Sequence, residues 1–265
     1  MSLSSHRRIV AALVVVAFAA FPIITLANHS WGGYHWARTS NPFTLKLGDN
    51  VSSQWDSHLD ISVSDWSAST VLNLTKVAGG ANPKNCRPTA GRVEVCNSKY
   101  GNNGWLGIAQ IWLSGGHISQ GIVKLNDTYY NTPTYNTPAW RNLVMCQEIG
   151  HTFGLDHQDE TFDNPNLGTC MDYTDDPNSN QHPNAHDYQM LEQIYAHLDS
   201  TTTVGQTVNR MPPAMNNIDF GDEKNWGVLV RQSANGRESQ YEQDFGNGLK
   251  VVTHVTWAEP RGNHR

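Results

Sequence analysis

Apolar and polar positions alternate in some segments of the chain and recur at helical spacing in others. Alternation typical of strands occurs at 43–47, 71–75, from 93 onward, 104–112 and 117–126. Helical spacing predicts helices over about 53–68, 139–153 and 186–198, the first with Ser52 or Ser53 as its N-cap. Together these strands and helices predict an α+β fold.

The last part of the chain is short and rich in predicted strands. A linker begins at 201, and the segments 226–230 and 249–255 have the composition of strands. Residues 246–248 read as a hairpin turn. We expect three units, 1–27, 28–200 and 201–265. A tail this small buries little surface by itself, so we expect it to pack on the preceding domain or to pair with a partner.

The beginning of the chain has the pattern of a targeting segment. Positive residues at 6–8 precede an apolar run at 9–24, and small residues at 25–27 predict cleavage after Ala27. The run is shorter than the ~20 residues that a spanning helix needs. We therefore expect a signal peptide over 1–27 and a secreted mature protein with no membrane span. No long pro-segment follows Ala27, so we expect no latency through a pro-domain.

The segment 146–158, CQEIGHTFGLDHQ, concentrates the candidate chemistry. On a helix, Gln147 and His151 share one face because they are four positions apart, and Glu148 lies beside them. Gly154 lets the chain leave the helix, so that His157 can return to the same point. Three such groups with one open position are typical of a catalytic zinc, and Glu148 could take a proton from a water that the metal activates.

This segment resembles the long signature HExxHxxGxxH of the metzincin zinc proteases, matrixins most of all, with Gln147 in place of the first His. The segment GTCMDY at 168–173 resembles their methionine turn, with Met171 as its methionine. Tyr173 matches a place where some metzincins carry a tyrosine that reaches toward the zinc. The resemblance covers about 43–197. It implies a twisted, mostly parallel sheet with an antiparallel edge strand, an active-site helix and a C-terminal helix.

The resemblance also implies an activity and its residues. It implies a zinc-dependent endopeptidase in which a zinc-activated water attacks the peptide carbonyl and Glu148 is the general base. Zinc would be held by Gln147, His151 and His157, and Tyr173 would help the metal to stabilise the oxyanion. The strand at 104–112 would form the sheet edge and pair with the backbone of a protein or peptide substrate. Alternatively, it is an ordinary strand whose glycines lie at close contacts.

Gln147 departs from the family pattern, because an amide oxygen is a weaker zinc ligand than an imidazole. Three interpretations follow. Gln147 is a genuine but weak ligand, or another histidine completes the site, with His117, His182 and His186 as candidates. In the third, the chain is a catalytically inactive metzincin-fold protein that binds a peptide or another partner.

Four cysteines in an exported chain predict two disulfides. Of the three connectivities we favour Cys86–Cys96, which closes a short loop, and Cys146–Cys170, which ties the metal helix to the methionine turn. The loop 127–138 is rich in oxygen ligands and would allow Ca²⁺ besides Zn²⁺, although it matches no specific calcium loop. The formal net charge of −6 gives no reason to expect a nucleic acid partner, and we expect a monomer.

Overall fold

The structure is a computed structural model that describes residues 29–207, 211–216 and 218–258. The predicted signal peptide therefore lies outside the described residues. The elements, in chain order, are β1 (His35–Trp36), β2 (Phe43–Asn50), α1 (Asp56–Trp66), β3 (Leu72–Ala78), β4 (Val93–Ser98), β5 (Trp105–Ser114), β6 (His117–Asn126), α2 (Asp127–Tyr130), α3 (Pro138–His151), the 3-10 helix η1 (Pro177–Ser179), α4 (Ala185–Ile194), α5 (Pro213–Asn216), the 3-10 helix η2 (Glu223–Asn225), β7 (Val228–Gln232), β8 (Glu238–Gly246) and β9 (Leu249–Trp257).

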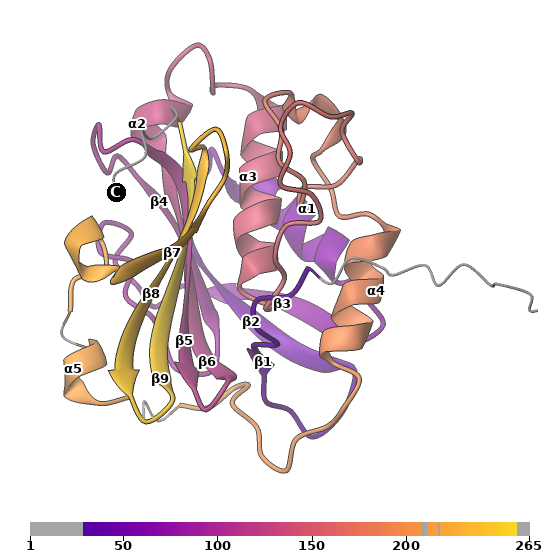
Figure 1. The fold of residues 1–265 in the computed structure, drawn as a ribbon, viewed down its shortest axis with the longest axis vertical. Helices are drawn as coiled ribbons and strands as arrows, with labels where there is room; N and C mark the ends of the chain where they lie inside the picture. Colours follow the sequence, from indigo (N-terminus) through magenta and orange to yellow (C-terminus); the bar gives the residue numbers. More distant parts are fainter. Residues whose placement is uncertain (1–28, 208–210, 217, 259–265) are drawn as a thin grey trace, which may run out of the picture.

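One mixed sheet runs through the molecule in the order β3-β2-β4-β6-β5-β9-β8-β7, with β1 paired to β6 off this path. The strands β3, β2, β4 and β6 are parallel to one another, whereas β5 pairs antiparallel with β6 and the three C-terminal strands continue the sheet in antiparallel pairs. The expected mixed α/β sheet with few helices is present. Its helices α1, α3 and α4 lie together beside the sheet, and α5 lies beyond β9 (Figure 1).

The antiparallel strand β5 is not an edge strand, which corrects the sequence prediction. β9 pairs with it along its length, from Trp105 opposite Trp257 to Ser114 opposite Leu249. The predicted hairpin of the C-terminal extension forms as β8 and β9, and β7 adds the outer strand. The extension therefore continues the sheet of the preceding domain. A short hairpin alone is marginally stable, and this pairing buries Val251, Val252 and Val255.

Helix α3 packs closely on the sheet and on α1. Gly107 of β5 faces it so tightly that a Cβ there would lie 2.5 Å from Val144 Cγ1 and 2.6 Å from Glu148 Oε1. On another side, the buried Trp66 of α1 donates its indole N–H to the carbonyl of Cys146 at 3.1 Å. The absence of a side chain at Gly107 thus lets the helix sit directly against the strand.

Both favoured disulfides are present, Cys86–Cys96 and Cys146–Cys170, and they account for all four cysteines. The second joins α3 to the methionine turn. Among the described residues no helix is both long and apolar enough to cross a membrane.

The ends of several helices differ from the sequence prediction. The helix expected over 53–68 spans Asp56–Trp66. Its N-cap is Trp55, whose side chain makes no capping hydrogen bond. The expected cap Ser52 instead accepts a hydrogen bond from Trp55 N at its backbone carbonyl. The last helix begins in a capping box of Asn184 and Asp187 and ends at Ile194. Residues 127–130, expected as loop, form α2 because Asn126 caps Thr128.

We predict that Gly150→Ala destabilises the protein. A Cβ at Gly150 would lie 2.7 Å from Met171 Sδ and 2.7 Å from Trp66 Cζ2, and overpacking of this kind costs about 1–3 kcal/mol. Helix propensity alone predicts the opposite sign, a gain of about 1 kcal/mol. Denaturant unfolding distinguishes the two, with Ser57→Ala on the exposed face of α1 as the control. A Gly150→Ala protein as stable as the parent would contradict the packing described here.

Candidate functional site

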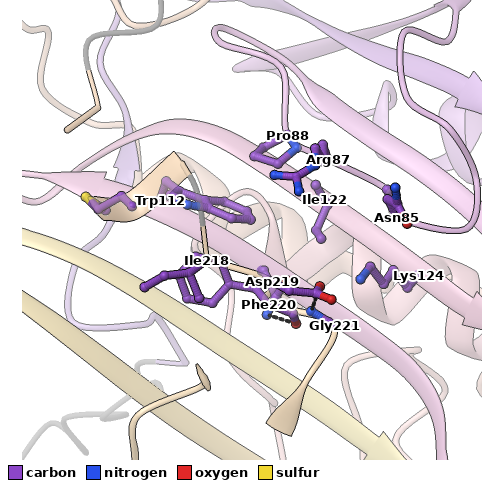
Figure 2. Close-up of a pocket in the computed structure, with 13 residues that line it drawn as sticks. Asn85, Arg87, Pro88, Trp112, Ile122, Lys124, Ile218, Asp219, Phe220 and Gly221 are labelled. Atoms are coloured by element: carbon purple, nitrogen blue, oxygen red, sulfur yellow. Dashed lines mark hydrogen bonds between the residues drawn. The ribbon is translucent and has the colours of Figure 1, made fainter. Parts of the chain in front are cut away.

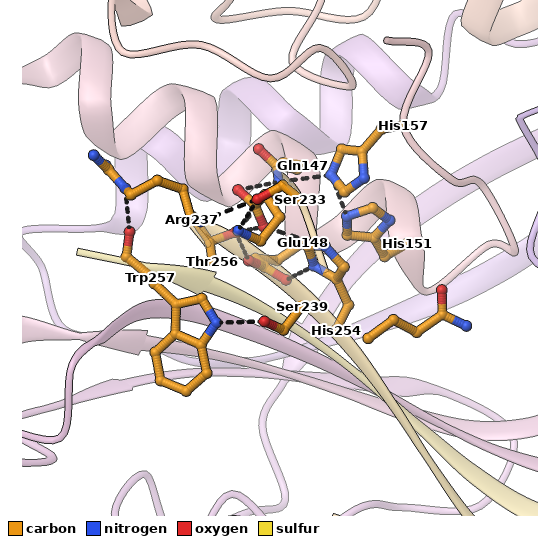
Figure 3. A network of polar contacts seen from close by, with 12 residues as sticks. Gln147, Glu148, His151, His157, Ser233, Arg237, Ser239, His254, Thr256 and Trp257 are labelled. Carbon is orange, nitrogen blue, oxygen red and sulfur yellow. Dashed lines mark hydrogen bonds and ion pairs between the residues drawn. The ribbon is translucent and has the colours of Figure 1, made fainter. Parts of the chain in front are cut away.

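The helix α3 presents three of the predicted site residues from its C-terminal half. The helix starts with Pro138 in its first turn and Thr137 as N-cap, whose hydroxyl accepts from Trp140 N at 3.2 Å. Gln147, Glu148 and His151 follow on the face turned toward β5 and β9 (Figure 3). Glu148 and His151 have no exposed surface, and Gln147 is 2 % exposed.

The break after α3 brings His157 back to His151, as the sequence predicts. Gly154 has φ +93°, and a Cβ there would lie 1.9 Å from Tyr34 O, so only glycine fits this turn. The Nε2 atoms of His151 and His157 are 3.2 Å apart. His151 Nδ1 lies 2.9 Å from the Leu155 carbonyl, which can only accept a proton; Nδ1 therefore donates, and the Nε2 lone pair is left free.

The methionine turn lies next to this pair. The buried Met171 receives a hydrogen bond at its carbonyl from Gln158 N (2.5 Å), one residue beyond His157. The Tyr173 ring centre is 4.2 Å from that of His157. Burial, and then the neighbouring carboxylates Glu238 and Glu160, raise the pKa of Tyr173 well above its usual value. The neutral phenol therefore lies beside His157.

Gln147 presents its amide nitrogen, not its oxygen, to these neighbours. Gln147 Nε2 lies 2.9 Å from His157 Nε2, 3.2 Å from Thr256 Oγ1 and 3.4 Å from Glu238 Oε1. A carboxylate only accepts hydrogen bonds, so Glu238 favours this orientation of the amide. An amide nitrogen is no metal ligand. The weak-ligand role expected for Gln147 stays a prediction, and the amide acts here as a hydrogen-bond donor.

A third imidazole reaches the site from β9, which sequence reasoning missed. His254 is 1 % exposed, and its ring centre lies 3.9 Å from that of His151 and 4.7 Å from that of His157. These three histidines each offer a ligand atom within 4.8 Å of one another. None of the three histidines considered from sequence is among them. His117 lies near Asp199, His182 pairs with Asp65, and His186 stacks on His29.

The available signal was the alternation of the last strand. Positions 252, 254 and 256 share one face of β9, and Val252 belongs to the core on which α3 packs. His254 and Thr256 are therefore polar residues on a core-facing side. The sequence shows these two polar residues, but it does not show that β9 pairs with β5, and only that pairing places them at the site.

Two carboxylates surround His254. Its ring nitrogens lie 3.6 Å from Glu148 Oε2 and 3.2 Å from Glu238 Oε2. Thr256 bridges the same carboxylates, donating to Glu148 Oε1 at 2.7 Å and lying 3.1 Å from Glu238 Oε2. Burial alone would lower the pKa of His254, but the two carboxylates raise it to about 9. Burial likewise raises the pKa of Glu148.

The donor set at this point fits a zinc ion. Burial lowers the pKa of His151 well below its usual value and that of His157 to about 4, so both rings are neutral. His157 Nδ1 lies 3.5 Å from Asp156 Oδ1, an arrangement that supports a ligand histidine from behind. Two neutral Nε2 atoms then face each other at 3.2 Å, and a separation of about 3.3 Å is what two ligands of a tetrahedral zinc require.

The site is closed to solvent in this conformation. Its five side chains, from Gln147 to His254, are between 0 % and 4 % exposed. Arg231 of β7 also pairs with Asp156, beside His157, and lies 2.6 Å from Glu160. A cavity of about 220 Å³ does occur between β5, β6 and the segment before η2, where Trp112, Lys124 and Phe220 line it (Figure 2). It contains no residue of the site.

The sequence and the structure were compared with known families, curated proteins and solved structures. No protein-family model matches the sequence, and no curated protein matches it. Among solved structures, the chain is similar to the high choriolytic enzyme 1 of the medaka fish Oryzias latipes, a hatching enzyme and zinc-protease, with a TM-score of 0.35 and 10 % sequence identity over 62 % of this chain and 96 % of that one.

We predict that Thr256→Val destabilises the protein by about 1–3 kcal/mol. The change keeps the shape of the side chain but removes the donor to Glu148 Oε1, and a buried carboxylate that loses its hydrogen bond costs about that much. Thr75→Val on the exposed side of β3 is the matched control. Equal free energies of unfolding for the two variants would show that Thr256 does not hold Glu148.

Proposed function

We propose that the protein is a zinc-dependent peptidase whose C-terminal extension covers the active site in the conformation described here. The observation that carries this proposal is a buried group in which His151 and His157 face each other and His254 joins His151 to the carboxylate of Glu148. Two histidines alone would be common in a core. A general base beside them, with a neutral tyrosine on the other side, is the set that peptide hydrolysis requires.

In the closed state we assign the third zinc ligand to His254 and not to Gln147. His254 offers a ring nitrogen within 4.8 Å of those of the other two histidines, and imidazole is the better zinc ligand. Without a metal, the Gln147 amide N–H groups lie against His157 Nε2, Thr256 and Glu238. A zinc ion would replace the contact with His157 and leave the other two in place. When the hairpin of β8 and β9 is displaced, the Gln147 amide loses Glu238 of β8 and Thr256 of β9 and is free to turn its oxygen toward the metal.

The residues of the chain divide the reaction between them. A bound zinc would polarise the substrate carbonyl and make a water acidic enough to lose its proton near neutral pH. Glu148 is placed to take that proton and to return it to the leaving amine. The raised pKa of Glu148 suits this exchange, because a base works best when its pKa approaches the working pH. The phenol of Tyr173 is close enough to His157 to assist at the oxyanion.

The C-terminal extension occupies the place where a substrate would bind. The resemblance to metzincins implies that β5 pairs with the substrate backbone, and β9 makes those backbone bonds instead. We propose that a protein or peptide substrate replaces β9 on β5 after the extension moves. The two disulfides support secretion, since such bonds persist in oxidising compartments. We also propose that the protein is a monomer and that its first domain ends at residue 200.

A second function is favoured by the burial of the site. If the extension never leaves β5, the protein is a closed, zinc-stabilised scaffold without turnover, as in the catalytically inactive alternative. All nine residues of β9 pair with β5, and eight of them also pair with β8, which favours a stable closed form. The presence of Glu148 favours the peptidase, because zinc binding alone requires no base.

We predict that His254→Gln weakens zinc binding at this site by more than about 100-fold, since loss of a ligand should exceed the 10- to 100-fold cost of losing an outer-shell partner. His182→Gln removes an exposed histidine paired with Asp65 and serves as the control. The measurement is competition with a zinc chelator at neutral pH. Equal zinc affinity of the two variants would exclude His254 as a ligand in the closed state.

We also predict that releasing the extension produces zinc-dependent peptidase activity. In this variant a specific protease site is inserted after the exposed Thr207, the chain is cut there, and mild denaturant displaces the extension. The cut protein should then hydrolyse an added unfolded substrate protein. The change Glu148→Gln in the same cut chain should lower that rate of hydrolysis by at least about 100-fold. The uncleaved insertion variant is the second control. Retained zinc without turnover in the displaced form would favour the inactive scaffold.

A further inference from the structure

A second group of metal-ligating side chains lies where the two ends of the first domain meet. His35 belongs to β1, His117 begins β6, and His197 and Asp199 follow α4. We call these four residues the histidine–aspartate cluster. It shares no residue with the site around His151. His35, His117 and Asp199 each offer a ligand atom within 4.8 Å of one another, and His197 Nε2 lies 3.2 Å from His35 Nε2.

The ligand atoms converge on one carboxylate oxygen. Asp199 Oδ1 lies 3.2 Å from His117 Nε2, 3.5 Å from His35 Nε2 and 3.7 Å from His197 Nε2. Neighbouring ligands of a tetrahedral zinc are about 3.3 Å apart, given zinc–nitrogen bonds of about 2.0–2.1 Å. The observed separations have that size. Hydrogen bonds alone cannot satisfy all three imidazoles, because one carboxylate oxygen accepts about two hydrogen bonds.

The residues behind the cluster fix its orientation. His35 Nδ1 lies 2.8 Å from the Gly33 carbonyl, so this nitrogen donates and Nε2 keeps its lone pair toward the cluster. The other oxygen of Asp199, Oδ2, accepts from Arg38 Nη1 at 2.8 Å and from Arg38 N at 3.1 Å. Asp199 Oδ1 is thereby directed to the imidazoles. A backbone carbonyl behind a ligand histidine, and a hydrogen-bonded ligand carboxylate, are the usual outer shell of a metal site.

The exposure of the four side chains would allow a metal ion to reach the cluster from solvent. The side chains of His35 and Asp199 are 11 % and 9 % exposed, whereas those of His117 and His197 are 35 % and 56 % exposed. The two buried ligands are held in place, and the two outer histidines can close on an ion that arrives. Three imidazoles and one carboxylate are ligands that zinc prefers, and four protein ligands leave no open position, which is typical of a structural zinc.

We propose that the histidine–aspartate cluster binds one structural zinc ion. The ion ties β1 and the start of β6 to the segment that leaves α4. That segment already joins the residues that follow β1, because Asp199 N donates to Arg38 O and Thr203 N to Ala37 O, each at 2.9 Å. It continues toward the C-terminal extension, so the metal would fix the point from which the extension departs. This proposal does not rest on the proposed peptidase activity.

The test compares zinc content in two variants of the full mature chain. His117→Gln/His197→Gln removes both exposed ligands and leaves the buried ones in place. His182→Gln is the matched control, because the side chain of His182 is 57 % exposed and pairs with Asp65 at 2.7 Å. After dialysis at neutral pH, elemental analysis should show one zinc fewer per chain in the double variant than in the parent, and no change in the control.

A second measurement uses Co²⁺, whose visible spectrum reports the tetrahedral site directly and so separates loss of this site from a general loss of folding. Co²⁺ added to the parent should produce the visible absorption of a tetrahedral site, and the double variant should lose the part that belongs to the cluster. The single variant His197→Gln should weaken zinc binding there by at least about 10-fold. A double variant with the zinc content and cobalt spectrum of His182→Gln would overturn the proposal. Loss of zinc only in His254→Gln would also overturn it while supporting the first site.

Discussion

The backbone pairing of β9 with β5 is the constraint on which the rest of the molecule depends. Without it, the sheet would end at β5, as the sequence predicts, and Glu148 would face an open edge. With it, His254 and Thr256 are carried into contact with the active-site helix. The small C-terminal segment also gains the core that it could not form alone. One strand pairing therefore both completes the fold and closes the site.

The closed site places several polar groups in a volume without solvent, and their charges must balance. Glu148 and Glu238 lie on either side of His254, and an isolated buried carboxylate would be expensive. Without metal, the protonated imidazole of His254 offsets these charges, as its raised pKa indicates. With zinc, the ion would take over that role and His254 would serve as a neutral ligand. A cation at this point thus stabilises the two buried carboxylates.

The sequence was sufficient for local features and for contacts within one motif. The spacing from Gln147 to His157 predicts the helix, the break at Gly154 and the return of the second histidine, all of which form. The two disulfides follow from the same reasoning. His254 was not predictable in this way, because its meeting with His151 depends on which strand pairs with β5. Strand partners are set by the whole core, whereas helical neighbours are set by spacing alone.

Gln147 and His254 are best understood as one exchange. An imidazole at 147 would compete with His254 for the space beside His157, whereas the amide at 147 donates to Glu238 and Thr256 and supports the strand that carries the replacement. Moving a ligand from the helix to the last strand has a consequence for the whole chain. If zinc binds as we propose, metal binding in the closed state would require a docked extension, and zinc and the C-terminal hairpin would stabilise each other. Opening the site costs both interactions together.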